Sequence, residues 1–285
     1  MNNTKIGMSG SDLDFYIKGH KSTIEMPAYI KELGLDCFEY SFGKGVRLST
    51  ETRQLIKKAF EDENIEISVH APYFINFANP DEEKIQNTFG YLYDSCIAVN
   101  DLGGQRVVFH PGSCLKNDKE TAFNLAYASF NRFLDKYGDY LAKHDLYVCP
   151  ETMGKSLQVG TVEEIGKLCA LHENILPCVD FGHVNARMQG ILKTYDDYKA
   201  LVDSLSTYVS DFKLKNMHIH FSKIEYGPKG EIKHLTFEDQ KYGPEFEPLA
   251  KLLVDYKLTP YLVSESSGTQ GIDAVYMKKI YNECK

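Results

Sequence analysis

The sequence predicts a single α/β domain, a (β/α)8 TIM barrel that occupies the whole chain from residue 1 to residue 285. Eight short apolar runs recur about every 36 residues, and stretches with helical periodicity separate them. Runs that are apolar throughout are typical of strands buried on both faces, as in a parallel barrel. No glycine-rich nucleotide-binding motif follows the first run, which leaves an open doubly wound sheet as the weaker alternative.

The predicted strands are short and rich in β-branched residues, and most of them end at a polar residue. They are Ile6–Ser9, Cys37–Tyr40, Ile65–His70, Arg106–His110, Leu146–Glu151, Ile175–Asp180, Met217–Phe221 and Tyr261–Glu265.

The spacing of apolar residues predicts helices between the strands. In Thr50–Asp62, Ile56 and Phe60 share one side, as expected for a helix that packs on a sheet. Thr161, followed three residues later by Glu164, has the capping-box form that marks the start of a helix. The other predicted helices are Ser22–Leu33, Glu82–Asp101, Lys119–His144, Thr161–His172, Tyr195–Phe212, Pro244–Tyr256 and Gly271–Tyr281.

The composition is that of an ordinary globular protein, with 43% hydrophobic and 25% charged residues. No apolar run reaches the roughly 20 residues of a membrane helix, and no signal-peptide core is present, so we expect a cytoplasmic protein that does not bind membranes. The seven cysteines form no CxxC pair, which argues against a disulfide framework and a cysteine zinc site. A net charge of −8 disfavours a polyanion-binding face, although bound divalent ions would reverse the charge locally.

Residue types that bind metals gather at the ends of the later strands. In a (β/α)8 barrel, the carboxyl ends of the strands and the loops after them form the active-site face. The residues in these positions are His70, His110, Glu151, Asp180, His183, His218, His220, His234 and Glu265. A single strand-end histidine is more often structural, but carboxylates beside a buried core need partners, and divalent cations best explain so many convergent ligands.

The mixture of imidazoles and carboxylates indicates zinc, with Mn²⁺ or Fe²⁺ as substitutes. Because these residues exceed the needs of one ion, we expect two or three ions. A carboxylate shared between two ions is the arrangement used for attack on phosphorus.

Six segments of the chain match the motifs of a known family in order and spacing. They are Ser68–Asn76, Phe109–Ser113, Pro150–Thr152, Val179–His183, Met217–His218 and Ser264–Glu265. With these motifs the chain resembles the endonuclease IV family of apurinic/apyrimidinic endonucleases, within the xylose isomerase-like TIM barrels.

The resemblance implies a zinc-dependent hydrolase for base excision repair, which cuts damaged double-stranded DNA on the 5′ side of abasic sites. Glu151 and Glu265 would be its catalytic residues, and a monomer is the expected state. The implied ligands are His70, His110 and Glu151 for the first ion, Glu151, Asp180, His218 and Glu265 for the second, and His183 and His234 for the third. Tyr73 and Phe74, with Arg47 beside them, are implied to enter the DNA at the lesion.

The third ligand set departs from the family pattern. The family has Asp two residues before the last histidine, where this chain has Ile232, so a third site without its carboxylate is expected. Glu231 and His220 are the candidates to replace it, and either requires a different path of the loop.

Two other functions stay open. A sugar isomerase or epimerase of the same superfamily would use the second ligand set to bind one metal, and two glutamates would exchange a proton beside it. The acidic surface favours this alternative, whereas the His70–His110 pair and the Tyr73–Phe74 loop favour the nuclease. A non-catalytic zinc-binding barrel is the third alternative, which the retained ligands disfavour.

Overall fold

Eight parallel strands form one sheet in the computed structural model, which describes residues 4–285. Around the sheet they are β6 (Tyr147–Pro150), β4 (Arg106–Phe109), β3 (Glu66–His70), β2 (Cys37–Ser41), β1 (Lys5–Ser9), β12 (Tyr261–Ser264), β9 (His218–Phe221) and β8 (Cys178–Asp180). Each predicted strand is present, with ends that differ by at most three residues. The prediction of a (β/α)8 TIM barrel is confirmed.

The barrel closes between β6 and the segment that leads into β8. Here two isolated parallel bridges, Val148 to Ile175 and Glu151 to Cys178, take the place of a continuous ladder. The amide of Leu176 donates to the carbonyl of Val148, and the amide of Thr152 donates to the carbonyl of Cys178. This closing seam is therefore held by few backbone contacts.

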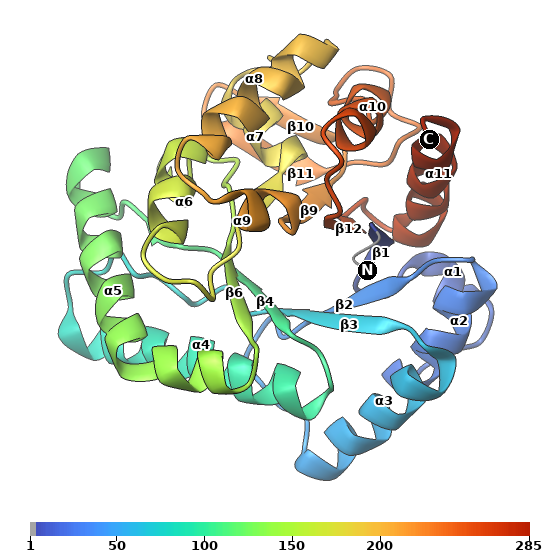
Figure 1. The fold of residues 1–285 in the computed structure, drawn as a ribbon, viewed down its shortest axis with the longest axis horizontal. Helices are drawn as coiled ribbons and strands as arrows, with labels where there is room; N and C mark the ends of the chain where they lie inside the picture. The colour runs from blue at the N-terminus through green and yellow to red at the C-terminus, as the bar shows by residue number, and fades with distance from the viewer. Residues whose placement is uncertain (1–3) are drawn as a thin grey trace.

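Helices surround the strands (Figure 1). The larger ones are α2 (Met26–Glu32), α3 (Thr50–Glu63), α4 (Glu82–Asp101), α5 (Lys119–Lys143), α6 (Val162–Cys169), α8 (Tyr195–Ser206), α10 (Glu247–Asp255) and α11 (Gln270–Glu283). The predicted capping box is present, because the Thr161 hydroxyl accepts from the amide of Glu164 and the Glu164 carboxylate accepts from the amide of Thr161. Within residues 4–285, no helix has both the length and the apolar character needed to cross a bilayer.

One predicted helix is divided in two. The expected helix Tyr195–Phe212 ends at Ser206, and a short helix α9 (Asp211–Lys215) begins after Ser210, whose hydroxyl accepts from the amide of Lys213. Tyr208 lies between the two and packs so closely on Gly166 of α6 that a β-carbon there would approach Tyr208 to 2.7 Å. This tertiary contact turns the chain where the periodicity alone continues.

Several short elements in the loops were not predicted. They are α1 (Leu13–Ile17), α7 (Phe181–Arg187), the small ladder β5 (Gly112–Ser113) with β7 (Gln158–Val159), and the hairpin β10 (Ile224–Gly227) with β11 (Gly230–His234). The predicted helix Ser22–Leu33 is present as a 3-10 turn, η1 (Thr23–Glu25), that continues into α2. The helix α7 and the hairpin follow β8 and β9 directly, so they lie at the carboxyl end of the barrel.

Alternate residues of each strand face the interior of the barrel. One set of strand residues, including Phe38, Val69 and Ile219, joins the main core beneath the helices. The other set includes Val108, Cys149 and Cys178, which form a separate cluster. All seven cysteines are unpaired thiols, and all but Cys284 are buried. The last inward-facing residue of each strand therefore lies at the carboxyl end, where the metal-ligand types occur.

Candidate metal centre

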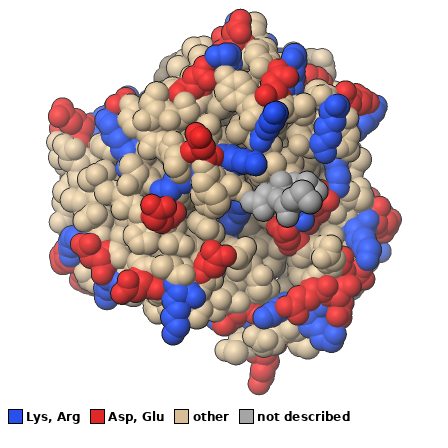
Figure 2. All heavy atoms as spheres, viewed as in Figure 1, with Lys and Arg blue, Asp and Glu red and all other residues tan. Residues whose placement is uncertain are grey.

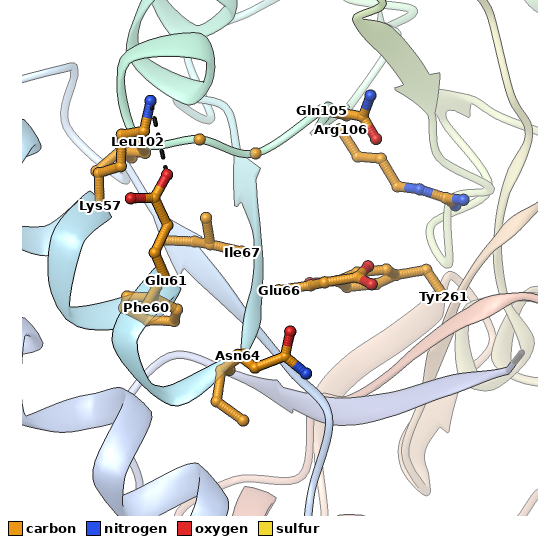
Figure 3. Close-up of a pocket in the computed structure, with 13 residues that line it drawn as sticks. Lys57, Phe60, Glu61, Asn64, Glu66, Ile67, Leu102, Gln105, Arg106 and Tyr261 are labelled. Atoms are coloured by element: carbon orange, nitrogen blue, oxygen red, sulfur yellow. Dashed lines mark ion pairs between the residues drawn. The ribbon is translucent and has the colours of Figure 1, made fainter. Parts of the chain in front are cut away.

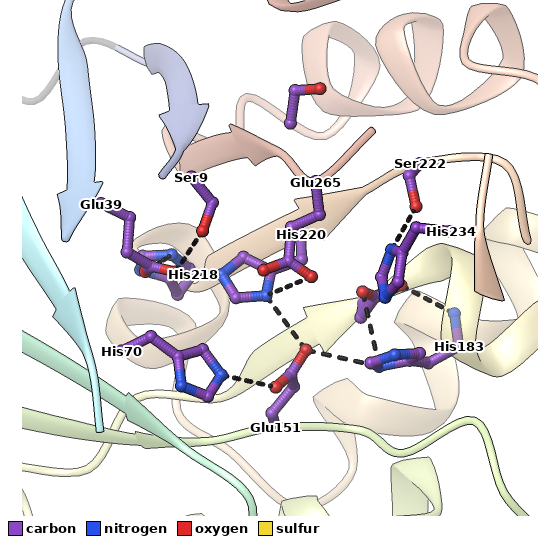
Figure 4. Close-up of polar contacts among 12 residues, drawn as sticks. Ser9, Glu39, His70, Glu151, His183, His218, His220, Ser222, His234 and Glu265 are labelled. Atoms are coloured by element: carbon purple, nitrogen blue, oxygen red, sulfur yellow. Dashed lines mark hydrogen bonds and ion pairs between the residues drawn. The ribbon is translucent and has the colours of Figure 1, made fainter. Parts of the chain in front are cut away.

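A pocket of about 270 Å³ lies over the carboxyl ends of the strands. Its lining includes His70, His110, His183, Glu231, His234 and Glu265. Figure 4 shows His70, His183, His220 and Glu265 around Glu151, with His234 next to His183. The structure thus brings most of the predicted ligands together.

The opposite end of the barrel has a pocket of about 290 Å³ with a different character (Figure 3). Its charged side chains are already paired. Lys57 lies 3.8 Å from Glu61, Glu66 lies 2.7 Å from Lys5, and Arg106 donates to the carbonyl of Asn216. Nothing in this pocket calls for a metal ion.

The first ligand set is formed by His70, His110 and Glu151. The Glu151 Oε2 atom lies 3.3 Å from His70 Nε2 and 3.1 Å from His110 Nε2. His70 Nδ1 lies 2.9 Å from the carbonyl oxygen of Ala71, to which it donates its proton, and this leaves Nε2 free to bind a metal. Burial opposes protonation of His70, but the contact with Glu151 raises its pKa to about 9.

The second set is formed by Glu151, Asp180, His220 and Glu265, whose ligand atoms lie within 4.8 Å of one another. His220 Nδ1 is 3.0 Å from Glu151 Oε1 and 3.5 Å from Glu265 Oε2. Asp180 Oδ1 accepts from the amide of His183 and so caps α7, whereas Oδ2 is buried 3.4 Å from His183 Nδ1 and has no hydrogen-bond partner among the described residues. A buried carboxylate oxygen without a hydrogen bond is costly unless a cation contacts it, so this set fits a divalent ion.

The structure places His220, and not the predicted His218, among the ligand residues of the second set. Both side chains face the interior, since they are two residues apart in β9. In the sheet, however, His220 pairs with Asp180 while His218 pairs with Cys178, one step deeper. His218 instead lies 3.1 Å from Glu39 and stacks on Tyr261, and burial lowers the pKa of His218 to about 4.

The third set consists of His183, Glu231 and His234, and it has the carboxylate that was expected to be missing. His183 donates from Nδ1 to the carbonyl of Thr152 and presents Nε2 at 3.5 Å from Glu231 Oε2. The rings of His183 and His234 lie 5.3 Å apart. Of the two candidates to replace the family aspartate, Glu231 is the one that the structure places beside His183 and His234.

A β-bulge explains how Glu231 reaches the site. In the β10–β11 hairpin, Glu231 pairs with Tyr226 and Lys233 pairs with Glu225, so Ile232 is an extra residue without a partner. The extra residue shifts the alternation of side chains by one position. Glu231 and His234, although three residues apart, consequently face the same side.

Electrostatics also favour bound cations at this centre. Burial opposes the charge of Glu151, but the histidines around it hold the pKa of its carboxyl well below the usual range. Burial and the neighbouring Glu151 and Glu265 raise the pKa of Asp180. Three carboxylates crowded in one buried place need positive charge, which divalent ions supply better than protons.

The residues expected to contact DNA lie at the rim of the pocket. Tyr73 and Phe74 are 54% and 46% exposed, and their ring centroids are 4.5 Å apart. Arg47 is exposed in a small neighbouring depression that shares Ser41 and Gly43 with the metal pocket. On the face shown in Figure 2, Lys and Arg are interspersed with Asp and Glu.

The sequence reasoning missed Glu39, which lies in the middle of β2 and is fully buried. Its carboxylate accepts from the hydroxyls of Ser9 and Ser68. A signal was available, because a charged residue inside an apolar strand must have buried partners.

Comparison with known proteins gives the family. The model of the xylose isomerase-like TIM barrel family matches residues 27–275. The uncharacterized protein MJ0133 of Methanocaldococcus jannaschii is 34% identical, over 89% of this chain and 90% of that protein. The probable endonuclease 4 of Acholeplasma laidlawii is 29% identical, over 82% of this chain and 81% of that protein.

Two kinds of solved structure share the fold. A D-tagatose 3-epimerase-like protein superimposes with a TM-score of 0.73 at 19% identity, over 99% of this chain and 97% of that one. Endonuclease IV from Thermus thermophilus superimposes with a TM-score of 0.65 at 17% identity, over 98% of both chains. At these identities the likeness shows the fold alone. The family match and the sequence relatives show more: the chain belongs to the xylose isomerase-like TIM barrel family, and its resemblance to endonuclease IV is confirmed.

Proposed function

We propose that this protein is a zinc-dependent endonuclease that hydrolyses DNA on the 5′ side of abasic sites. The observation that supports this proposal is the presence of three ligand sets at one pocket, with Glu151 in the first and second sets. Their donors are imidazoles and carboxylates, which suit zinc and also accept Mn²⁺ or Fe²⁺. Divalent ions bound there would supply an activated water and would stabilise the charge that develops on phosphorus and on the leaving oxygen.

The exposure of the ligands indicates the side from which a phosphate arrives. Glu151 and Asp180 are fully buried, whereas the side chains of His110 and Glu265 are 28% and 17% exposed and line the pocket. The exposed Lys155 also lines it. Incoming phosphate would thus pass Lys155, which attracts its charge, and reach the side of the centre formed by His110 and Glu265.

The rim aromatics fit a nucleic-acid substrate. Tyr73 lines the pocket, Phe74 packs beside it, and both rings are exposed, so they can stack on bases beside a gap in the duplex. Together with bound divalent ions, they offset the repulsion expected between DNA and a chain of net charge −8.

A sugar isomerase or epimerase is the less supported function. Such an enzyme needs only one metal, for which the second set suffices. The first and third sets would then have no role, nor would the exposed aromatics. The acidic composition favours this function, but it does not account for three ligand sets.

The test uses the purified protein, with its zinc content measured, and a labelled duplex that carries one abasic-site analogue. We expect incision 5′ to the lesion, loss of incision after chelation, and no incision of the undamaged duplex. Glu151→Gln is the control for a contaminating nuclease. Absence of incision by protein that holds two or three ions would overturn the proposal, and sugar isomerisation would be assayed next.

A further inference from the structure

Beneath the metal centre, the closed interior of the barrel holds another group of potential ligands. Cys178 in β8 and His218 and His220 in β9 each place one ligand atom within 4.8 Å of the others. All three side chains are fully buried. Neither His218 nor Cys178 takes part in the three ligand sets above.

Three of the four ring nitrogens of these histidines lack hydrogen bonds. Both ring nitrogens of His218 and the Nε2 atom of His220 are buried with no hydrogen-bond partner within residues 4–285. Leaving such groups unsatisfied costs about 1–3 kcal/mol each, so something is expected to contact them. Their burial inside the barrel rules out bulk water as the partner.

The contacts of Glu39 point the same way. Its carboxylate oxygens lie 3.1 Å from His218 Nε2 and 3.0 Å from His220 Nε2, yet neither contact is aligned as a hydrogen bond. The carboxylate therefore places negative charge beside both rings, whose Nε2 atoms have no hydrogen bond.

We propose that this group binds a further divalent ion, zinc by its chemistry, through Cys178, His218 and His220, with the Glu39 carboxylate close to both histidines. The Cys178 thiolate and the Glu39 carboxylate offset the charge of the ion, so that it needs no solvent. Hydrogen bonds from Ser9 and Ser68 hold the carboxylate in place at 3.3 and 3.2 Å. A buried site held by protein side chains alone is structural, and this one would join β8 to β9.

His220 would belong to two sites. Its Nδ1 atom faces Glu151 and Glu265 of the second set, while its Nε2 atom faces Glu39. If each nitrogen held an ion, the ring would give up its remaining proton to solvent. The buried ion thereby fixes the orientation of a ligand of the metal centre above it.

Sulfur distinguishes this site from the metal centre, whose three ligand sets contain only nitrogen and oxygen donors. The protein is produced in cobalt-containing medium, so that the ion enters during folding. Absorption from thiolate-to-cobalt charge transfer then reports on this site alone. In the zinc form, X-ray absorption should show a sulfur atom at about 2.3 Å from zinc.

We expect the charge-transfer band in the unaltered protein. Cys178→Ala should lose both the band and one bound ion per chain. Cys149→Ala is the matched control, because Cys149 is a buried thiol of the same interior cluster but lies outside the ligand group. Glu231→Gln should lose an ion of the third set and keep the band.

A cobalt-loaded protein without a thiolate band, or a zinc form without a sulfur ligand, would overturn the inference. Both measurements use the unaltered chain, so they decide the question even where Cys178→Ala does not fold. Neither depends on DNA incision, so a failure of the proposed nuclease function would leave this result unaffected.

Discussion

Deletion of Ile232 should leave the third ligand set intact, although it shortens the segment that carries two of the three ligands. Ile232 is the extra residue of the bulge in β11, where its neighbours Glu231 and Lys233 pair with the opposite strand. Without Ile232 the strand becomes regular. Glu231 and His234 are then two positions apart and still share a face.

Strand geometry gives the size of the effect. Two steps of about 3.3 Å place the α-carbons of Glu231 and His234 roughly 6.6 Å apart, close enough for both side chains to bind one ion. An alanine inserted after Ile232 instead lengthens the segment by one residue. With the bulge kept, the α-carbons of the two ligands are then three strand steps, roughly 10 Å, apart, and their side chains face opposite sides. The deletion removes a side chain that is 57% exposed, so the loss of buried apolar area costs only about 1 kcal/mol.

The assay is zinc content per chain, measured beside incision rates for the unaltered, deleted and inserted proteins. We expect the protein with the deletion to keep its zinc. Its incision rate should stay within about threefold of the unaltered rate, which corresponds to a change of less than ~1 kcal/mol in the activation free energy. The insertion should lose one ion. If the deletion loses an ion as the insertion does, the explanation of the third set by a bulge is wrong.

Four further predictions concern the other parts of the site. Glu151→Gln should lower incision by roughly 1000-fold, about 4 kcal/mol, while circular dichroism and thermal unfolding show a folded barrel, because an amide cannot supply the charge shared by two ligand sets. The apparent zinc affinity should rise as pH increases toward about 9, the pKa of His70 in the metal-free protein, because zinc displaces that proton; competition with a chelator across a pH series measures it. In the same metal-free protein, the stability from the His70–Glu151 contact should be complete below pH 6.5 and should disappear as pH rises through about 9, which urea unfolding would detect as a falling free energy of unfolding. Replacing Tyr73 or Phe74 by Ala should weaken binding to an abasic duplex by about 10- to 100-fold with unchanged zinc content, as fluorescence anisotropy would show; an unchanged Kd would exclude stacking.

The fold was largely predictable because its signals are local. A strand such as β3 is a short apolar run that ends at His70, and a helix such as α4 follows from its spacing of apolar residues. The break between α8 and α9 was not predictable, because it depends on the packing of Tyr208 on Gly166, residues far apart in the sequence. Short loop elements such as α7 carry too few residues for a periodic pattern.

The types of ligand were predictable, but the choice among neighbours was not. Between His218 and His220, the register of β9 against β8 decides which ring reaches Asp180, and that register is a property of the sheet. Glu231 was identified only as a candidate, since a bulge changes the side that a residue faces without changing the sequence around it. At these positions, the number of residues between two side chains does not predict how far apart they lie in the fold.

The position of the metal centre beside the seam between β6 and β8 also bears on the stability of the barrel. Glu151 follows β6 and Asp180 ends β8, so an ion of the second set would join the two strands whose backbones meet only at isolated bridges. Every other neighbouring pair in the barrel is joined by a ladder. Here the cross-link would be ionic, placed where the ring of strands is weakest. The same ion would then serve the reaction and hold the barrel closed, so that its loss would weaken both activity and the fold.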